Sequence, residues 1–242
     1  MGLWKEVLME YKVKINGIDV TATFSKEDID GIYVPLLKKL ASIRRKKGSR
    51  VIMMLAAPPG AGKSTLASFL AHLAKEVLPE NKVQAIGMDG FHLRQEYLLS
   101  HTANVGGREV SMVDIKGAPI TFDLEKLTAK VKEVAEGGIC SWPGYDRLGH
   151  NPYDDAVQVT ADIVILEGNY LLLDMDGWRG LRKYADYTAF IYRGEELLRD
   201  RLISRKMASG KSELAAEKFV DFSDMANVKL VLEKSTPADL NL

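Results

Sequence analysis

The chain has 242 residues, 46% of them hydrophobic, and its 33 lysine and arginine residues are balanced by 33 aspartate and glutamate residues. This size and apolar content fit a large α/β domain, and the balanced charge gives no field that favours nucleic acid or an anionic membrane, so we expect neither partner. One cysteine, Cys140, and the lack of any run of 18 apolar residues in the sequence lead us to expect a cytoplasmic protein.

Residues 1–48 have the pattern of an extension to the main domain. The stretch YKVKINGIDVTATF places Asn16 and Gly17 between two alternating runs, which is the strongest short-range signal for a β-hairpin. A helix that ends near residue 47 follows. We find no chemistry in this extension. Because an isolated hairpin must bury its apolar face, we expect it to pack on the domain or to join two copies in a homodimer.

Strands and helices alternate beyond residue 50. The predicted strands are 51–56, 82–88, 157–166 (in one or two pieces) and 187–192, and the predicted helices are 63–77, 123–136, 195–208 and 213–220. Such alternation predicts an α/β fold with a doubly wound, mainly parallel sheet and helices on both faces. We therefore divide the chain into the hairpin-helix extension, 1–48, and a main domain, 49–242.

The stretch AAPPGAGKST joins the first strand of this domain to its first helix. It matches the phosphate-binding pattern G-x-x-x-x-G-K-[ST], except that Ala57 stands in the first position. Such a loop aims backbone N–H groups at phosphate oxygens beside the positive end of a helix. Pro58 and Pro59 cannot donate, but all later loop residues can. We expect a nucleotide to bind Gly60, Ala61, Gly62, Lys63, Ser64 and Thr65, with Lys63 on the β- and γ-phosphates and Ser64 on Mg²⁺.

Two acidic residues close predicted strands, where ligands of α/β proteins gather. Asp89, in VQAIGMDGFHL, could accept the proton of an attacking hydroxyl group, or it could belong to an ordinary Asp-Gly turn. Glu167, in ADIVILEGNYLLL, could hold Mg²⁺, or it could mark a strand that reaches solvent. The sequence lacks the guanine-reading N/T-K-x-D motif and the L-S-G-G-Q signature, which disfavours a GTPase switch and a transport ATPase.

Six motifs follow one another between about residues 50 and 235: PPGAGKST, MDGFHL, KGAPITFD, YDR, ILEGNYLLL and RDRLISRKMASG. In their order the chain resembles the uridine kinase, pantothenate kinase and phosphoribulokinase superfamily, and most of all a bacterial branch partly associated with fructose uptake. The resemblance implies a P-loop NTPase-type fold and phosphoryl transfer from ATP, with Mg²⁺, to a hydroxyl group. It implies Asp89 as catalytic base, Glu167 as the acid associated with Mg²⁺, and a mobile helical lid at about 195–222.

The resemblance also suggests further contacts with the acceptor. Asp146 in PGYDRLGH falls where uridine kinases touch the acceptor, and Arg147 and His150 are its neighbours. His92 lies three residues beyond Asp89. Arg108 belongs to the stretch 101–116, which we expect to cover the acceptor. Each has a plainer alternative: a solvated turn for PGYDRLGH, a structural role for His92 and an exposed surface position for Arg108.

The predicted lid carries two arginines on one helical face. Arg201 and Arg205 are four residues apart, a spacing that suits stabilisation of the charge on a transferring phosphoryl group. The alternative is a solvated face paired with nearby acidic residues. Asn227, in MANVKLV, is a candidate for contacting the nucleotide.

From these observations we expect a small-molecule kinase that uses ATP and Mg²⁺, with a sugar acceptor ahead of a nucleoside or a pantothenate-like one. The chain lacks the DDFY motif of uridine kinases and continues its Asp-Gly-Phe differently from pantothenate kinases, so neither acceptor can be carried over. The alternative from another class is a P-loop ATPase that is not a kinase and whose ATP binding gates a partner docked on the N-terminal hairpin.

Overall fold

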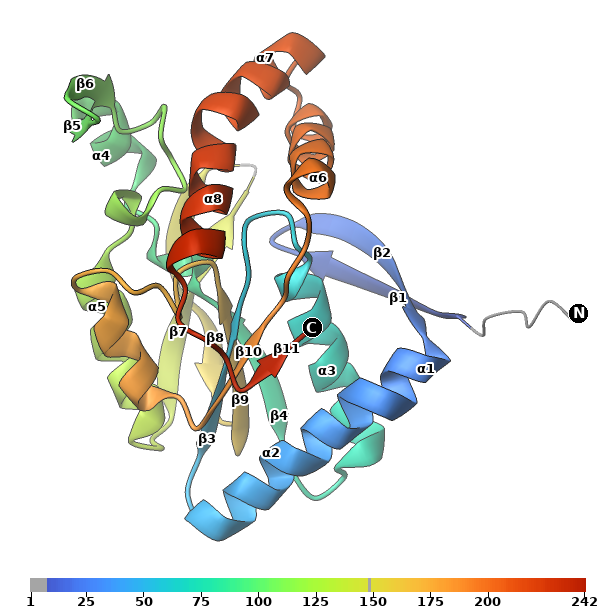
Figure 1. Ribbon diagram of the computed structural model, residues 1–242. Coiled ribbons are helices and arrows are strands. Elements are labelled where there is room, and N and C mark those ends of the chain that lie inside the picture. Colours follow the sequence, from blue (N-terminus) through green and yellow to red (C-terminus); the bar gives the residue numbers. More distant parts are fainter. Residues whose placement is uncertain (1–7, 148) are drawn as a thin grey trace, which may run out of the picture.

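The computed structural model describes residues 8–147 and 149–242 and centres on a five-stranded sheet (Figure 1). In the order of pairing, its strands are β11 (Leu240–Asn241), β10 (Tyr187–Phe190), β3 (Val51–Ala56), β9 (Ile163–Gly168) and β4 (Val83–Gly87). All four pairings are parallel. Because β3 lies in the middle, with β9 and β4 on one side and β10 and β11 on the other, the sheet is doubly wound, as predicted.

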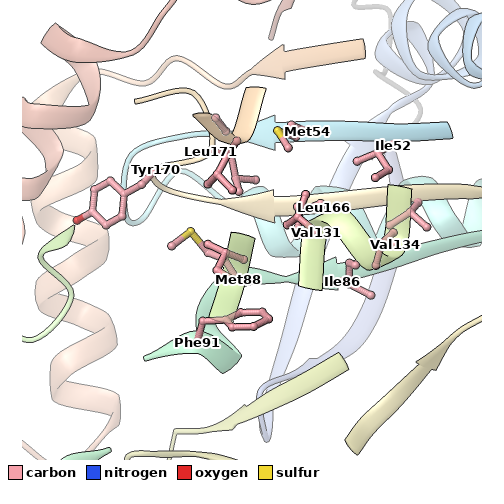
Figure 2. Close-up of a cluster of buried hydrophobic side chains, with 14 of the residues drawn as sticks. Ile52, Met54, Ile86, Met88, Phe91, Val131, Val134, Leu166, Tyr170 and Leu171 are labelled. Carbon is pink, nitrogen blue, oxygen red and sulfur yellow. The ribbon is translucent and has the colours of Figure 1, made fainter. Parts of the chain in front are cut away.

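Helices cover both faces of this sheet, because successive residues of a buried strand point in opposite directions. On one face, Ile52 and Met54 pack in a cluster with Val131 of α5 (Leu124–Ala135), which Figure 2 shows in close-up. On the other face, Val51 and Met53 pack in a cluster with residues of α2 (Val34–Lys47) and α3 (Lys63–Val77). The two clusters form the core and hold the strands in place.

The remaining elements lie around this frame. The helices are α1 (Lys26–Asp28), α4 (Gln95–Ser100), α6 (Glu195–Ala208), α7 (Glu213–Phe219) and α8 (Met225–Lys234), joined by short turns of other helix types at η1 (Ile29–Tyr33), η2 (Met88–Phe91), η3 (Pro119–Thr121), η4 (Trp178–Tyr184) and η5 (Val220–Asp224). Three antiparallel ribbons pair β1 (Leu8–Ile15) with β2 (Ile18–Ser25), β5 (Thr102–Val105) with β6 (Arg108–Ser111), and β7 (Cys140–Asp146) with β8 (Asn151–Val159).

Most predicted elements are confirmed, and three of them (51–56, 63–77 and 195–208) have the predicted bounds. The predicted strand 157–166 is two strands in different sheets, β8 and β9, because the chain leaves the ribbon after Val159 and enters the central sheet at Ile163. The prediction missed the ribbon β5–β6, the first half of β8, the strands β7 and β11, and the helices α4 and α8. The residues of β5–β6 and of the first half of β8 are mostly exposed and polar, so they give little periodic apolar signal.

The N-terminal hairpin has the register that its turn predicts, with Ile15 opposite Ile18 and Val13 opposite Val20. The turn residues Asn16 and Gly17 both have positive φ, 49° and 86°, as a tight two-residue hairpin turn requires. Figure 1 shows the ribbon lying against α3 beside the central sheet. Packing on the domain, the first of the two expected roles, is therefore confirmed. The domain division at residue 48 and the homodimer stay predictions.

Three helices, α6, α7 and α8, stand together at one end of the sheet (Figure 1). Gly210, with φ 95°, separates α6 from α7, and the Ser212 side chain caps α7 by accepting from the N–H of Ala215 at 3.4 Å. A hinged lid would need such a break and new cap, and the lid itself stays a prediction. Within the described ranges 8–147 and 149–242, no helix is long and apolar enough to span a membrane.

Candidate active site

The carboxyl ends of β3, β9 and β4 form one edge of the sheet, because these strands are parallel neighbours. The phosphate-binding loop follows β3, Glu167 lies at the end of β9, and Asp89 follows β4. Glu167 is opposite Leu55 of β3 and Gly87 of β4 in the register. The motifs that are separate in the sequence are therefore adjacent in space, at the position where α/β proteins bind ligands.

The phosphate-binding loop is a tight turn that leads directly into α3. Gly60 and Gly62 have φ of 83° and 91°, a conformation that favours glycine. The Ala61 N–H donates a hydrogen bond to the Pro58 carbonyl oxygen, with 3.3 Å between nitrogen and oxygen. Ala57 is not among the residues with positive φ, so alanine replaces the usual glycine there without backbone strain.

Ser64 and Glu167, the two predicted metal ligands, lie side by side. The Ser64 hydroxyl donates to Glu167 Oε1 at 2.7 Å. Burial raises the pKa of Glu167, and the nearby Lys63 ammonium opposes that rise. Burial lowers the pKa of Lys63, while Glu167 and Asp89 partly offset it. In the described parts of the chain no three His, Cys, Asp or Glu residues cluster as a metal site. One hydroxyl and one carboxylate fit Mg²⁺ that takes its other ligands from phosphates and water.

Asp89 is held by the short turn η2. Figure 2 shows Met88 and Phe91, on either side of it, within the buried cluster. Between them, a Cβ on Gly90 would come within 2.4 Å of the Pro143 carbonyl oxygen, so β7 packs directly on the glycine. Burial of the flanking residues and this close approach fix the turn, which leaves the Asp89 carboxylate at the edge of the sheet.

Two donors reach the Asp89 carboxylate. Its Oδ2 accepts from Arg147 Nη2 at 3.1 Å and from Asn16 Nδ2 of the N-terminal hairpin at 3.4 Å. Burial favours the protonated form, but Arg147 and the other cationic groups nearby outweigh it and hold the pKa of Asp89 below its ordinary value. Asp89 is therefore ionised at neutral pH, the state that a general base requires.

A cavity of about 320 Å³ opens between this edge and helices α6, α7 and α8. Seven residues that the sequence singles out line it: Lys63, Asp89, His92, Arg147, His150, Arg205 and Asn227. A second cavity, of about 230 Å³, lies between the edge, α3 and the hairpin, and it is lined by Ser64, Asp89 and Glu167 among others. Asp89 and Tyr145 line both cavities, so the predicted base stands between them.

Among the residues predicted to contact the acceptor or to stabilise the transferring phosphoryl group, three line neither cavity: Arg201, Arg108 and Asp146. All three are exposed, Arg201 on α6, Arg108 on β6 and Asp146 at the end of β7. The structure thus separates the predicted pair on the lid, since Arg205 enters the cavity and Arg201 does not. Gly60, Ala61, Gly62 and Thr65 form the loop and the first turn of α3 without lining either cavity. The roles given to all these residues remain predictions.

Histidine 92 is held in a neutral state. Its ring stacks on Phe122 with 3.9 Å between the ring centroids. Burial lowers the pKa of His92 to about 4, and the Asp89 carboxylate offsets only part of that shift. A neutral imidazole beside an ionised carboxylate can hydrogen-bond to an acceptor molecule without adding charge.

Sequence reasoning missed several residues of the larger cavity, among them Lys116, Tyr145, Asn169 and Lys206. Lys116 donates to Gln95 Oε1 at 2.6 Å and to the His150 carbonyl oxygen at 2.7 Å, and burial together with Lys206 lowers its pKa to about 8. Lys116 and Asn169 lie within the motifs KGAPITFD and EGNYLLL, so the signal was present although no role was attached to them.

Comparisons with known proteins agree with this geometry. The phosphoribulokinase / uridine kinase family model matches residues 52–242. The chain belongs to this family. Members of the phosphoribulokinase / uridine kinase family are ATP-dependent kinases, so the chain is a kinase with a small-molecule substrate, and ATP and usually Mg²⁺ are the expected ligands of its P-loop. Family membership leaves the acceptor open.

Individual relatives cover most of the chain. YggC of Escherichia coli (strain K12), an uncharacterized protein, is 40% identical over 233 residues, which span 96% of this chain and 94% of YggC. The pantothenate kinase of Lactococcus lactis subsp. lactis (strain IL1403) is 26% identical over 75% of this chain and 62% of that enzyme. A solved structure from Silicibacter sp. TM1040, described as a "putative fructose transport system kinase", is 28% identical, with a TM-score of 0.77, and spans 87% of this chain and 98% of its own.

Proposed function

We propose that this protein transfers the γ-phosphate of ATP to a hydroxyl group of a small sugar-like metabolite. The observation that carries the proposal is the arrangement at one sheet edge. Lys63 of the phosphate-binding loop lines the larger cavity, the hydrogen-bonded pair Ser64–Glu167 lines the smaller one, and the ionised Asp89 lines both. Phosphate binding, metal binding and proton acceptance are the three roles that this reaction needs.

In the proposed reaction Asp89 accepts the proton of the acceptor hydroxyl as its oxygen bonds to the γ-phosphorus. The bond between that phosphorus and the oxygen bridging to the β-phosphate breaks, and ADP leaves. Lys63 and Arg205 stabilise the negative charge on the phosphates. Mg²⁺, held by Ser64 and Glu167, would neutralise further charge on the β- and γ-phosphates. Closure of the lid over the site would exclude water, which would otherwise hydrolyse ATP.

The charge of the larger cavity restricts the chemical class of the acceptor. Two carboxylates, Asp89 and Asp224, line it. The cationic side chains that line it are Lys63, Lys116, Arg147, Arg205, Lys206 and Lys211. ATP with Mg²⁺ uses part of this positive charge, and the remainder favours an acceptor with an acidic group. Similarity to the Silicibacter protein, whose description mentions fructose, supports a sugar. We therefore place the acceptor among sugars, and sugar acids or sugar phosphates ahead of neutral sugars.

The test is ADP release over a panel of ketoses, pentoses, sugar acids, sugar phosphates, nucleosides and pantothenate. We expect slow release by the protein with ATP alone, a large increase with one sugar-type compound, and a phosphorylated product detectable by mass spectrometry. Lys63→Ala should weaken ATP binding. Asp89→Ala should keep ATP binding and lose transfer. An enzyme that ignores every small molecule but responds to a protein partner would instead support the alternative of an ATPase that gates an interaction.

A further inference from the structure

The N-terminal hairpin is anchored on α3 by a cluster of aromatic side chains. Phe24 of β2 stacks on Phe69 of α3 with 3.8 Å between ring centroids and 11° between ring planes. Tyr11 of β1 packs edge-on against Phe69 at 5.4 Å, and its hydroxyl is 2.9 Å from Ser68 Oγ. Phe69 is fully buried. These contacts fix the direction of the ribbon relative to the helix that begins at the phosphate-binding loop.

In this orientation the turn of the hairpin lies next to the candidate active site. Asn16 donates to Asp89 Oδ2 at 3.4 Å. Asn16 also lines the smaller cavity together with Lys14 and Ile15, and Ile18 lines the larger one. The turn therefore borders both cavities on either side of Asp89, although 73 residues separate Asn16 from Asp89.

We propose that this turn is a wall of the acceptor site, in which Asn16 positions the Asp89 carboxylate and Ile18 packs on the apolar C–H face of the acceptor. The proposal rests on the kinase function proposed above. It goes beyond the family match, which begins at residue 52 and leaves the hairpin outside. The positioning role belongs to Asn16, and Asp89 keeps the chemical role.

The geometry gives this role a physical reason. Both donors, Arg147 and Asn16, contact Oδ2 of Asp89, which leaves Oδ1 for the acceptor hydroxyl. Arg147 makes the carboxylate less basic through its charge and its hydrogen bond, whereas the neutral Asn16 amide can fix the orientation at a smaller cost in basicity. A general base must lie within hydrogen-bonding reach of the proton that it accepts, so fixing its orientation raises the rate.

Asn16 can be tested without disturbing the hairpin. Its φ of 49° is strained for most side chains, but glycine adopts it freely and aspartate tolerates it. Asn16→Gly therefore removes the amide and keeps the turn, and Asn16→Asp keeps the turn and adds a second carboxylate. The matched control is Asp155→Gly, because Asp155 has φ 53°, is exposed and lines neither cavity.

We expect Asn16→Gly to lower kcat for phosphoryl transfer about tenfold, the effect of losing one hydrogen bond to a charged group, with KM for ATP and the melting temperature unchanged. Asn16→Asp should lower kcat more and move the acid limb of the pH–rate profile upward, because a like charge favours protonated Asp89. Ile18→Thr, which keeps the β-branched shape, should raise KM for the acceptor alone. Asp155→Gly should match the parent protein.

The outcomes separate this proposal from the kinase assignment. If the parent transfers phosphate and Asn16→Gly keeps its kcat within twofold, the role of the turn is wrong and the kinase function stands. If Asn16→Gly changes KM for ATP or the melting temperature as much as kcat, the turn is structural and the proposal also fails. If no small molecule in the panel accepts phosphate from the parent, both proposals fall together.

Discussion

Two hairpins in this protein have the same kind of turn and opposite relations to the candidate active site. The ribbon β1–β2 turns at Asn16-Gly17, and the ribbon β5–β6 turns at Gly106-Gly107, all four residues with positive φ. The first ribbon lies along α3 and brings its turn to Asp89. The second projects from the domain beside α4, as Figure 1 shows, and its turn and its Arg108 are exposed.

What differs is the surface on which each ribbon packs. The first ribbon packs two aromatic side chains, Tyr11 and Phe24, on Phe69 of α3. The second packs around a small separate cluster of four buried residues, Leu98, Ala103, Met112 and Ile115, outside the two main clusters. The turn residues are sufficient to form a hairpin, but the surface on which the hairpin packs determines whether it reaches the candidate active site. The predictions below test this difference, from the largest expected effect to the smallest.

The largest effect on kcat should come from replacing Asp89, the residue that the turn of the first hairpin contacts. Asp89→Ala should lower kcat for transfer by about 10²–10⁴, because the acceptor hydroxyl loses its general base, and should leave the Kd for ATP unchanged. In this background a second change, Asn16→Gly, should have no further effect on kcat, since nothing remains to be positioned. Steady-state kinetics with ATP titration measures both. A further loss in the double variant would show that Asn16 acts on something other than Asp89.

A second change removes part of the aromatic contact between the first hairpin and α3. Phe24→Ala should lower the free energy of unfolding by about 2 kcal/mol, because Phe24 is partly buried against Phe69, and should lower kcat/KM for the acceptor as the turn leaves Asp89. Val105→Ala, the matched change on the second hairpin, should alter stability by less than about 0.5 kcal/mol, because Val105 is exposed. Urea unfolding followed by fluorescence measures both variants, and equal losses would refute the contrast.

The second hairpin should affect the site through the segment that follows it, which carries Lys116. The pKa of Lys116 is lowered to about 8, so its ammonium is charged below pH 8 and loses its charge as the pH rises through that value. KM for an acidic acceptor should therefore rise between pH 7 and 9. In Lys116→Met, KM should be higher at pH 7 and should no longer rise over this range. A rise that persists in this variant would assign the effect to another group.

The smallest effect should come from the exposed part of the second hairpin. Arg108→Ala should change kcat/KM for the acceptor by less than about twofold, because Arg108 lines neither cavity. The same assay on Arg147→Ala, which removes an ion pair to Asp89, gives the reference for an arginine inside the site. If the two variants lose comparable activity, the second hairpin folds over the acceptor during turnover, as the sequence alone led us to expect.

Local patterns in the sequence were sufficient to predict most elements of the central sheet and the helices that cover it, and to single out the acidic residues where two of its strands end. The bounds of β3, α3 and α6 and the register of the first hairpin follow from periodicity, caps and turn residues, which act over a few residues. The loop AAPPGAGKST, Asp89 and Glu167 could be singled out because each directly follows or closes a buried strand. Parallel strands then bring these ends together, which is a consequence of the fold class itself.

The lid arginines show where local reasoning stops. Residues four apart on a helix differ by about 40° in direction and about 6 Å in height, so Arg201 and Arg205 share a face. Which of them reaches the cavity depends on where α6 sits over the sheet edge. That position is set by the packing of Leu198 and Leu202 in the core, and it places Arg205 inside and leaves Arg201 exposed.

The first hairpin shows the same division most clearly. The sequence by itself determined that Asn16-Gly17 is a turn and that Asp89 is an acid at a strand end. Only the tertiary structure decided that the two meet, because their contact depends on Tyr11 and Phe24 packing on one face of α3. Turns form from interactions between neighbours in the chain, whereas the contact between Asn16 and Asp89 requires two clusters of side chains, distant in sequence, to be buried together.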